Sequence, residues 1–264
     1  MIRIADMPRL SRRTLLAGGL AAIALPALAQ SSMIGNPEAY AGGRLRARII
    51  PGFHPPEPER LTRPLGLEAR DAFLFIPASL DLSQPVPLVL ALHGAGQAAA
   101  DLLGQIDREA SRAGVVVVSV SSRASTWDLS AGPVGPDAAF IDQALQTVFD
   151  QVAIDPKRLA VLGMSDGASY ALSTGMVNGD LFTDVIAFAP VRFVAPTSQG
   201  QPRFYVSSGR RDMGTSYANQ RNMVRQLEGF GYPVRHHAHG GGHIVDRDGL
   251  RESLTRLVAG GVAP

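Results

Sequence analysis

Short apolar runs alternate with amphipathic segments along most of the chain. Within each run almost every residue is apolar, whereas a strand with one face in water alternates apolar and polar residues. The runs span residues 71–77, 86–92, 115–120, 159–162, 185–189 and 204–206. Unbroken runs of this length are typical of parallel strands that are buried on both faces. The pattern therefore predicts an α/β fold built around a mostly parallel sheet.

Segments with helical spacing separate these runs. Apolar residues share one helix face over residues 102–110, 140–152, 223–230 and 250–257, and a helix-like stretch covers 168–176. We expect the last strand at 234–239. Right-handed crossovers between successive strands place helices on both faces, so we predict a doubly wound sheet. In such a sheet the functional site lies beyond the carboxyl ends of the strands.

The N-terminus carries the features of an export signal. Arg12 and Arg13 precede an apolar stretch from Leu15 to Ala29, which ends in a small-x-small site. The paired arginines predict a twin-arginine-type signal peptide over residues 1–29, cleaved after Ala29. The alternatives are an ordinary secretory leader and a membrane anchor, although the stretch of about 15 residues is shorter than the roughly 20 that span a bilayer. We therefore expect a periplasmic or secreted protein without a stable membrane anchor, which meets the twin-arginine export machinery in transit.

Charge and cysteine content exclude several kinds of partner and site. The formal charge is +2, and residues 1–29 carry +3, so the rest of the chain has a net charge of −1. Without a basic surplus in the mature chain, we expect no nucleic-acid partner.

The absence of cysteine excludes disulfides, thiolate metal sites and a cysteine nucleophile. After the leader, we predict a Pro- and Gly-rich lead-in at residues 30–68 and one α/β domain at 69–264.

A candidate nucleophile lies in the middle of the chain. Residues 163–167 read Gly-Met-Ser-Asp-Gly and fit the pattern G-x-S-x-G. The motif stands between a predicted strand and a helix-like stretch, the context in which it forms a sharp turn that exposes the serine. Ser165 is therefore the candidate nucleophile. The alternative is a tight strand–helix turn with an incidental serine.

A serine hydroxyl is a weak nucleophile at neutral pH and needs a base. In this type of site the chain order is serine, acid, histidine, which excludes the two histidines before Ser165. His243 follows three glycines in the loop beyond the last predicted strand, so we predict that it is the base. The alternatives are a solvated loop histidine, or a metal site formed by His237, His239 and His243. No acidic motif accompanies these histidines, and we expect no metal.

The base needs a carboxylate that orients it. Asp212 leaves the end of the predicted strand at 204–207, and this places it at the same edge of the sheet as Ser165. We predict that Asp212 is the acid. The alternative is a surface aspartate that pairs with Arg210 or Arg211.

A glycine-rich turn at residues 92–97, Leu-His-Gly-Ala-Gly-Gln, follows another predicted strand. Such a turn lets a backbone N–H face the oxygen on which negative charge develops during the reaction. We expect the first donor from Ala95 or Gly96, and the second from Asp166 at the start of a helix. We expect His93 to brace this loop.

The only tryptophan, Trp127, comes shortly after the predicted strand at 115–120. A lone tryptophan is most often a core residue because its side chain is large and apolar. Its place in a loop at the carboxyl edge nevertheless favours a wall of the substrate pocket, to which Gly96 would also belong.

Together these segments resemble the α/β-hydrolase superfamily, and in particular bacterial esterases of the phospholipase/carboxylesterase and polyhydroxyalkanoate-depolymerase-like groups. The resemblance covers about residues 70–260 and is most specific from the G-x-S-x-G segment to residue 182. It is carried by LHGAGQ at 92–97, TWD at 126–128, GPDAAFID at 135–142, VAIDPKRLAVLGMSDGASYAL at 152–172, NGDLF at 178–182 and GGGH at 240–243. The chain departs from relatives after Asp212, where it lacks their usual apolar-Pro ending.

The resemblance implies the α/β-hydrolase fold and a serine hydrolase that cleaves small or polymeric carboxylic esters. Ser165 would be the nucleophile, His243 the base and Asp212 the acid, and Ala95 and Asp166 would donate the oxyanion N–H groups. Such a mechanism requires no cofactor. Acyl transfer and depolymerisation of a polyester or an acylated polysaccharide would use the same three residues. A non-catalytic binding protein on this scaffold is a further alternative.

Overall fold

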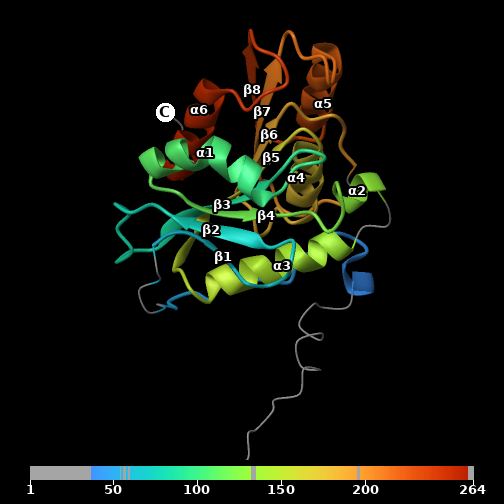
Figure 1. The fold of residues 1–264 in the computed structure, drawn as a ribbon. Helices are drawn as coiled ribbons and strands as arrows, with labels where there is room; N and C mark the ends of the chain where they lie inside the picture. Colours follow the sequence, from blue (N-terminus) through green and yellow to red (C-terminus); the bar gives the residue numbers. More distant parts are fainter. Residues whose placement is uncertain are drawn as a thin grey trace, which may run out of the picture. The chain divides into compact units, whose positions relative to one another are not determined.

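A single mixed sheet forms the centre of the structure (Figure 1). The structure is a computed structural model and describes residues 37–53, 55, 58, 60–131, 135–194 and 197–260; the predicted signal peptide lies outside them. Within these residues the sheet has the strand order β1-β2-β4-β3-β5-β6-β7-β8. The strands are β1 (Leu61–Pro64), β2 (Ala72–Ile76), β3 (Val86–Leu92), β4 (Val116–Val120), β5 (Ile154–Met164), β6 (Asp184–Phe188), β7 (Arg203–Gly209) and β8 (Val234–His239).

Strands β3 to β8 all run parallel, while β1 and β2 pair antiparallel with their neighbours. In the centre, Leu90 of β3 lies opposite Val118 of β4 on one side and Val161 of β5 on the other. These strands are buried along almost their whole length, as their unbroken apolar sequences predict. The prediction of a mostly parallel sheet is therefore confirmed.

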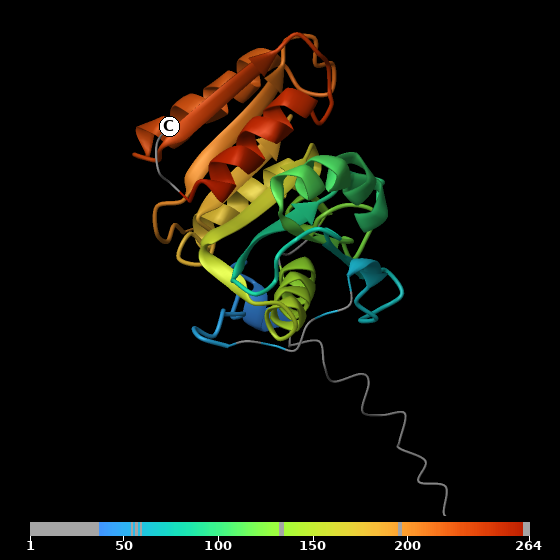
Figure 2. The same ribbon diagram turned by 90° about the vertical axis from the view of Figure 1, so that its left-hand side faces the viewer.

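Helices cover both faces of the sheet (Figures 1 and 2). They are α1 (Ala99–Ala113), α2 (Asp128–Ala131), α3 (Pro136–Phe149), α4 (Asp166–Val177), α5 (Tyr217–Gly229) and α6 (Arg247–Val258), with a short 3₁₀ helix η1 (Pro37–Tyr40) near the start. Helices α1 and α6 pack on one face with their apolar sides inward, and α3, α4 and α5 pack on the other. The doubly wound arrangement is confirmed. None of the helices in the described ranges is long and apolar enough to cross a membrane.

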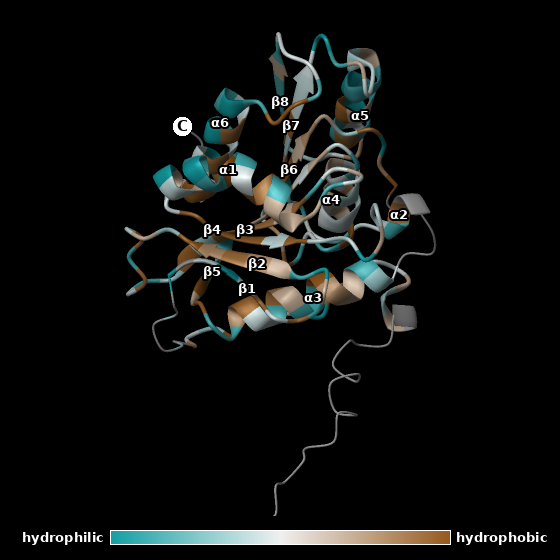
Figure 3. Ribbon diagram, viewed as in Figure 1, coloured by the Kyte–Doolittle hydropathy of each residue, from teal (hydrophilic) through white to brown (hydrophobic). Residues whose placement is uncertain are grey.

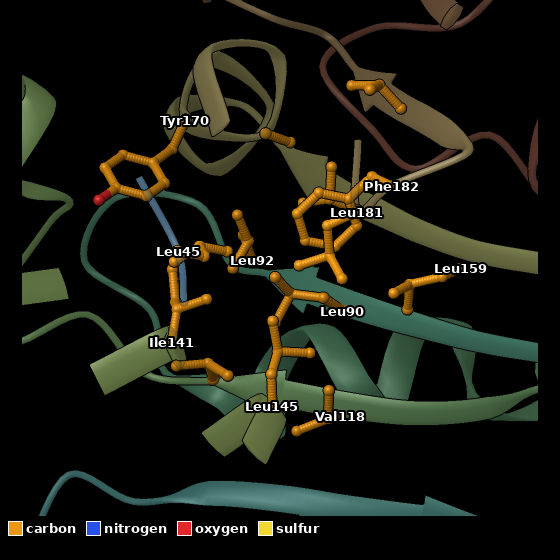
Figure 4. Packing of buried hydrophobic residues seen from close by; sticks show 14 of the residues in the cluster. Leu45, Leu90, Leu92, Val118, Ile141, Leu145, Leu159, Tyr170, Leu181 and Phe182 are labelled. Atoms are coloured by element: carbon orange, nitrogen blue, oxygen red, sulfur yellow. The ribbon is translucent and has the colours of Figure 1, made fainter. Parts of the chain in front are cut away.

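The core lies in two layers, one on each face of the sheet. Figure 3 shows the apolar residues gathered along the strands and on the helix sides that face them. On the α3 face, Leu90 and Val118 from adjacent strands lie beside Ile141 and Leu145 of α3 (Figure 4). Each of these four side chains is fully buried, and burial of such a side chain contributes about 1.5–3 kcal/mol.

The segment before residue 69 belongs to the domain, so the predicted boundary between residues 68 and 69 is wrong. Tyr40, Leu45 and Ala47 are buried in the core layer that contains α3. Strand β1 forms the edge of the sheet next to β2. Sequence patterns missed both features, because β1 has only four residues, one of them proline, and 40–47 has no regular apolar period.

Candidate active site

Ser165 stands on a sharp turn between β5 and α4. Its backbone has φ 58° and ψ −117°, a left-handed conformation that residues with a side chain rarely adopt. Its N–H donates to the carbonyl of Phe188 in the neighbouring strand at 2.9 Å, which anchors the turn on the sheet. This strained and anchored turn therefore holds the hydroxyl of Ser165 above the carboxyl edge of the sheet.

Two glycines make this turn possible. A Cβ atom on Gly163 would lie 2.1 Å from the carbonyl oxygen of Gly167. A Cβ on Gly167 would lie 2.1 Å from the carbonyl oxygen of Leu92 in β3. Both distances are far below van der Waals contact, so only glycine lets α4 start this close to β5 and β3.

His243 reaches Ser165 from the loop after β8. Its Nε2 lies 2.8 Å from Oγ of Ser165, and its Nδ1 lies 3.0 and 2.9 Å from the two carboxylate oxygens of Asp212. The structure thus brings together the three residues that the sequence singled out. An ionised carboxylate only accepts hydrogen bonds, so Nδ1 of His243 carries the proton and Nε2 is free to accept from the serine hydroxyl.

Asp212 is held by several donors at once. Its side chain is 0% exposed, whereas that of His243 is 29% exposed. Oδ1 accepts the N–H groups of Gly214 and Thr215 at 2.7 and 3.0 Å, and Oδ2 accepts Nε2 of Gln220 at 3.0 Å. Burial raises the pKa of Asp212, but His243 and the two backbone donors outweigh it and lower the pKa. The carboxylate is therefore ionised at neutral pH.

Arg210 and Arg211, the two arginines beside Asp212, contact other groups. This disfavours the alternative in which Asp212 is a surface aspartate paired with one of them. Arg211 donates through Nε to the carbonyl of Gly240 at 2.6 Å. Arg210 lies over the ring of Tyr217, 5.2 Å from its centre. The acid loop is thus tied to the loop that carries His243.

Close glycine contacts support the imidazole itself. A Cβ on Gly214 would lie 2.9 Å from Nδ1 of His243, so the ring packs directly on the acid loop. A Cβ on Gly209 would lie 2.2 Å from the carbonyl oxygen of Gly242. The N–H of Arg211 donates to the carbonyl of Gly241 at 3.0 Å. These contacts fix the glycine loop on which His243 stands.

The turn at residues 94–97 lies beside Ser165. Its ends are joined by a hydrogen bond from the N–H of Gln97 to the carbonyl of Gly94 at 3.2 Å, and Gly96 has φ +75°. The N–H of Gly94 donates to Oε1 of Gln97 at 3.0 Å, and the N–H of Gly96 donates to the carbonyl of Ser125 at 2.7 Å. Ala95 is therefore the one residue of this turn whose N–H has no acceptor among the described residues.

This pattern favours one of the two residues expected as the first oxyanion donor. The N–H of Gly96 is already used by Ser125, so Gly96 is not a candidate, and Ala95 remains. Asp166, the other expected donor, is the first residue of α4. Its carboxylate accepts the hydroxyl of Thr126 and lies 3.9 Å from NH2 of Arg192. These contacts hold the start of α4 in place next to Ser165.

His93 occupies the position expected of a bracing residue. It is fully buried, its Nε2 accepts the N–H of Ser122 at 3.0 Å, and its Nδ1 lies 2.7 Å from the carbonyl of Gly94. Because Nε2 is an acceptor here, the proton is on Nδ1. Burial is the main cause that lowers the pKa of His93, so the ring stays neutral.

Trp127 does not line the substrate pocket, so that interpretation is wrong. Its side chain is 0% exposed, its Nε1 donates to the carbonyl of His93 at 2.8 Å, and its ring lies 5.0 Å from that of Tyr170. The tendency of a large aromatic ring to be buried therefore decides its environment, although Trp127 lies in a loop at the carboxyl edge of the sheet. Trp127 therefore supports the 92–97 loop from within the core.

A cavity of about 510 Å³ opens over Ser165. Ala95, Gln97, Ser165, His243 and Ile244 are among the residues that line it, and Ile244 is 48% exposed at its rim. Gly96 is exposed in the same turn but is not part of the cavity wall, contrary to the expectation. The cavity therefore leaves Ser165 and Ala95 accessible from solvent.

The other histidines of β8 are engaged away from Ser165. Nε2 of His237 lies 2.9 Å from Oδ2 of Asp246, and Nδ1 of His239 accepts the N–H of Gly241 at 3.1 Å. The described residues include no group of three or more side chains placed to hold a metal ion. The structure therefore does not unite His237, His239 and His243 as a ligand set.

Three residues of the site escaped the sequence reasoning. Gln97 supports the 94–97 turn, and Thr215 and Gln220 bind the carboxylate of Asp212. Only Gln97 carried a signal, because it ends the segment LHGAGQ. Thr215 lies in a loop and Gln220 near the start of α5. No sequence pattern shows that the fold brings these two residues to Asp212.

No family model and no curated protein matches the sequence. Solved structures do resemble it. A carboxylesterase from Bacillus cereus matches with a TM-score of 0.55 and 19% identity, over 72% of this chain and 93% of the other. An acetyl xylan esterase from Aspergillus awamori matches with a TM-score of 0.60 and 15% identity, over 72% and 94%.

A ferulic acid esterase from Anaeromyces mucronatus matches with a TM-score of 0.57 and 16% identity, over 82% of this chain and 99% of the other. The matches thus span almost the full length of these enzymes. At such low sequence identity these matches support only the fold, and they agree with the sheet order and the strand–helix turn at Ser165. The chain has the α/β-hydrolase fold.

Proposed function

We propose that the protein is a serine hydrolase that cleaves carboxylic esters through an acyl-enzyme intermediate. The observation that carries the proposal is the chain of contacts from Ser165 Oγ to His243 Nε2 at 2.8 Å, and from His243 Nδ1 to Asp212. This is the arrangement that turns a serine hydroxyl into a nucleophile. The printed names of the structural neighbours, a carboxylesterase, an acetyl xylan esterase and a ferulic acid esterase, support an ester as the substrate.

In the first half of the reaction, His243 takes the proton of Ser165 as Oγ attacks the ester carbonyl. Asp212 keeps the imidazole in the required tautomer and stabilises its positive charge. The N–H groups of Ala95 and Asp166 face the oxygen that becomes negative in the tetrahedral intermediate. His243 then protonates the departing alcohol, and the acyl group stays on Ser165.

In the second half, water enters the cavity above Ser165. His243 removes a proton from this water, which attacks the acyl-enzyme, and the same oxyanion donors act again. The acid leaves and Oγ regains its proton from His243. Every step uses side chains and backbone groups of this chain together with water.

The test of this proposal is the variant Ser165→Ala. Its kcat on a p-nitrophenyl ester should fall by roughly 10⁴-fold or more, because the nucleophile is lost. A fluorophosphonate probe should label the wild-type protein at Ser165 and leave the variant unlabelled. Wild-type turnover by Ser165→Ala, or an unlabelled wild-type protein, would contradict a serine hydrolase and favour a non-catalytic scaffold.

We also propose that the protein works in the periplasm or outside the cell. The paired Arg12 and Arg13 and the apolar stretch that ends at Ala29 support export by the twin-arginine route. This route carries folded proteins, which suits a chain without cysteine.

A further inference from the structure

Gln97 ties together the turn that presents Ala95. Its backbone N–H donates to the carbonyl of Gly94, and its side-chain Oε1 accepts the N–H of Gly94. Gly94 is therefore bound from both sides by one residue. Since the N–H of Gly94 requires an acceptor, the oxygen of the carboxamide, and not its nitrogen, faces Gly94.

The contact lies directly against the nucleophile. A Cβ on Gly94 would lie 3.0 Å from Oε1 of Gln97 and 3.6 Å from Cβ of Ser165. Both side chains thus flank the same face of Gly94, and both line the cavity. Gly94 itself is buried, although it borders the cavity, and Oε1 of Gln97 is the only acceptor for its N–H among the described residues.

A buried N–H without an acceptor is costly enough to rearrange a short turn. The N–H of Gly94 belongs to the peptide plane between His93 and Gly94. A rotation of this plane shifts the adjoining plane between Gly94 and Ala95, which carries the proposed oxyanion donor. Gly96 cannot compensate, because its N–H is held by Ser125 on the outer side of the turn. Nδ1 of His93 and the N–H of Gln97 hold the carbonyl of Gly94, and the side chain of Gln97 holds its N–H, so these contacts together set the orientation of the Ala95 N–H.

We propose that Gln97 is a positioning residue of the oxyanion hole, which occupies the N–H of Gly94 and thereby directs the N–H of Ala95 to the substrate oxygen. This inference rests on the proposed ester hydrolysis. The oxyanion contact is complete only in the transition state, so Gln97 acts on kcat and leaves substrate binding nearly unchanged.

The first test is the variant Gln97→Met, which keeps the side-chain length and removes the acceptor. On a p-nitrophenyl ester, kcat should fall by about 10- to 100-fold, a part of the loss seen when an oxyanion donor is removed, while KM changes less than about twofold. The matched control is Gln226→Met, an exposed residue near the end of α5 that is not among the residues lining the cavity, and it should match the wild type. An unchanged kcat, or an effect confined to KM, would overturn the inference.

The second test is the variant Gln97→Glu, which keeps an acceptor for Gly94 and adds a negative charge beside the forming oxyanion. Its kcat at pH 8 should fall at least tenfold, and the ratio of variant to wild type should recover as the pH falls toward the ordinary glutamate pKa of about 4.3. A wild-type kcat at every pH would mean that the side chain at position 97 does not lie beside the forming oxyanion, and it would overturn the inference. This variant decides the question if Gln97→Met does not fold.

The variant Ser165→Ala separates this inference from the proposed function. If Ser165→Ala abolishes turnover but both Gln97 variants retain wild-type kcat, only the role of Gln97 fails. If Ser165→Ala retains wild-type turnover, the proposed function fails, and the role of Gln97 fails with it.

Discussion

At the scale of single residues, Asp212 shows how one carboxylate serves several donors. Its oxygens accept hydrogen bonds from His243, Gly214, Thr215 and Gln220, and its side chain has no exposed surface. Every one of these partners donates, so the site requires a group that only accepts. The lowered pKa of Asp212 follows, because these donors favour the ionised form more than burial disfavours it.

The variant Asp212→Asn should therefore lose most of the activity while retaining the fold. The NH₂ group of a carboxamide donates hydrogen bonds, so in the variant it would face one of the groups that donate to Asp212. If it faces Nδ1 of His243, it favours the tautomer in which Nδ1 accepts and Nε2 carries the proton. We expect kcat on a p-nitrophenyl ester to fall by about 10³- to 10⁴-fold. The control is Asp248→Asn, whose side chain is 81% exposed on α6 and which should match the wild type. A loss below tenfold in Asp212→Asn would show that Asp212 does not orient the base.

At the scale of elements, the passage from β5 into α4 depends on glycine on both sides of Ser165. The variant Gly167→Ala places a methyl group 2.1 Å from the carbonyl oxygen of Leu92, and a central strand cannot move away without disturbing the sheet. We expect a loss of about 2 kcal/mol or more in the free energy of unfolding, measured by urea denaturation.

The same substitution in α1 provides the control for this prediction. Gly104 lies on the exposed side of the helix, and a Cβ there would meet nothing within 4 Å. Gly104→Ala should raise the free energy of unfolding by roughly 0.5–1 kcal/mol, because alanine loses less backbone entropy in a helix. Equal effects of the two substitutions would mean that the close approach at Gly167 is not what stabilises the turn.

Elements with a strong apolar period could be predicted from the sequence, and weakly patterned ones could not. Strand β3 at 86–92 and strand β8 at 234–239 were predicted with the bounds that the structure shows. Strand β1 and helix α2 were missed, since four residues give too few turns or alternations to form a pattern. Trp127 was placed in the wrong environment, because the sequence cannot tell which loops fold back into the core.

At the scale of the whole domain, the site could be predicted because parallel strands fix where loops meet. Ser165, Asp212 and His243 each follow the carboxyl end of a strand, β5, β7 or β8, and these ends share one edge. The sequence could not show which backbone N–H groups of the 94–97 turn remain unpaired. That result depends on side-chain and backbone contacts with Ser125 and Gln97, which only coordinates reveal.

The segment before β1 is held on the domain by two buried polar side chains. Asp142 of α3 accepts the hydroxyl of Tyr40 at 2.7 Å and the N–H groups of Arg46 and Ala47 at 2.6 Å. Asn178, at the end of α4, accepts the N–H of Leu45 at 2.8 Å. Figure 1 shows the start of this segment beside α3. Burial and the charge of Asp142 raise the pKa of Tyr40 to about 12, so its hydroxyl remains a donor at neutral pH.

The variant Asp142→Ala should release this segment while the sheet stays folded. It leaves three donors without this acceptor, two of them buried, and we expect the free energy of unfolding to fall by about 2–3 kcal/mol. Because Arg44, Arg46 and Arg48 lie in the segment, limited trypsin digestion should cut there faster than in the wild type. The control is Asp150→Ala at the exposed end of α3, which should keep the wild-type cleavage rate. Equal cleavage of Asp142→Ala and wild type would mean that Asn178 and the packing of Leu45 and Ala47 hold the segment without Asp142.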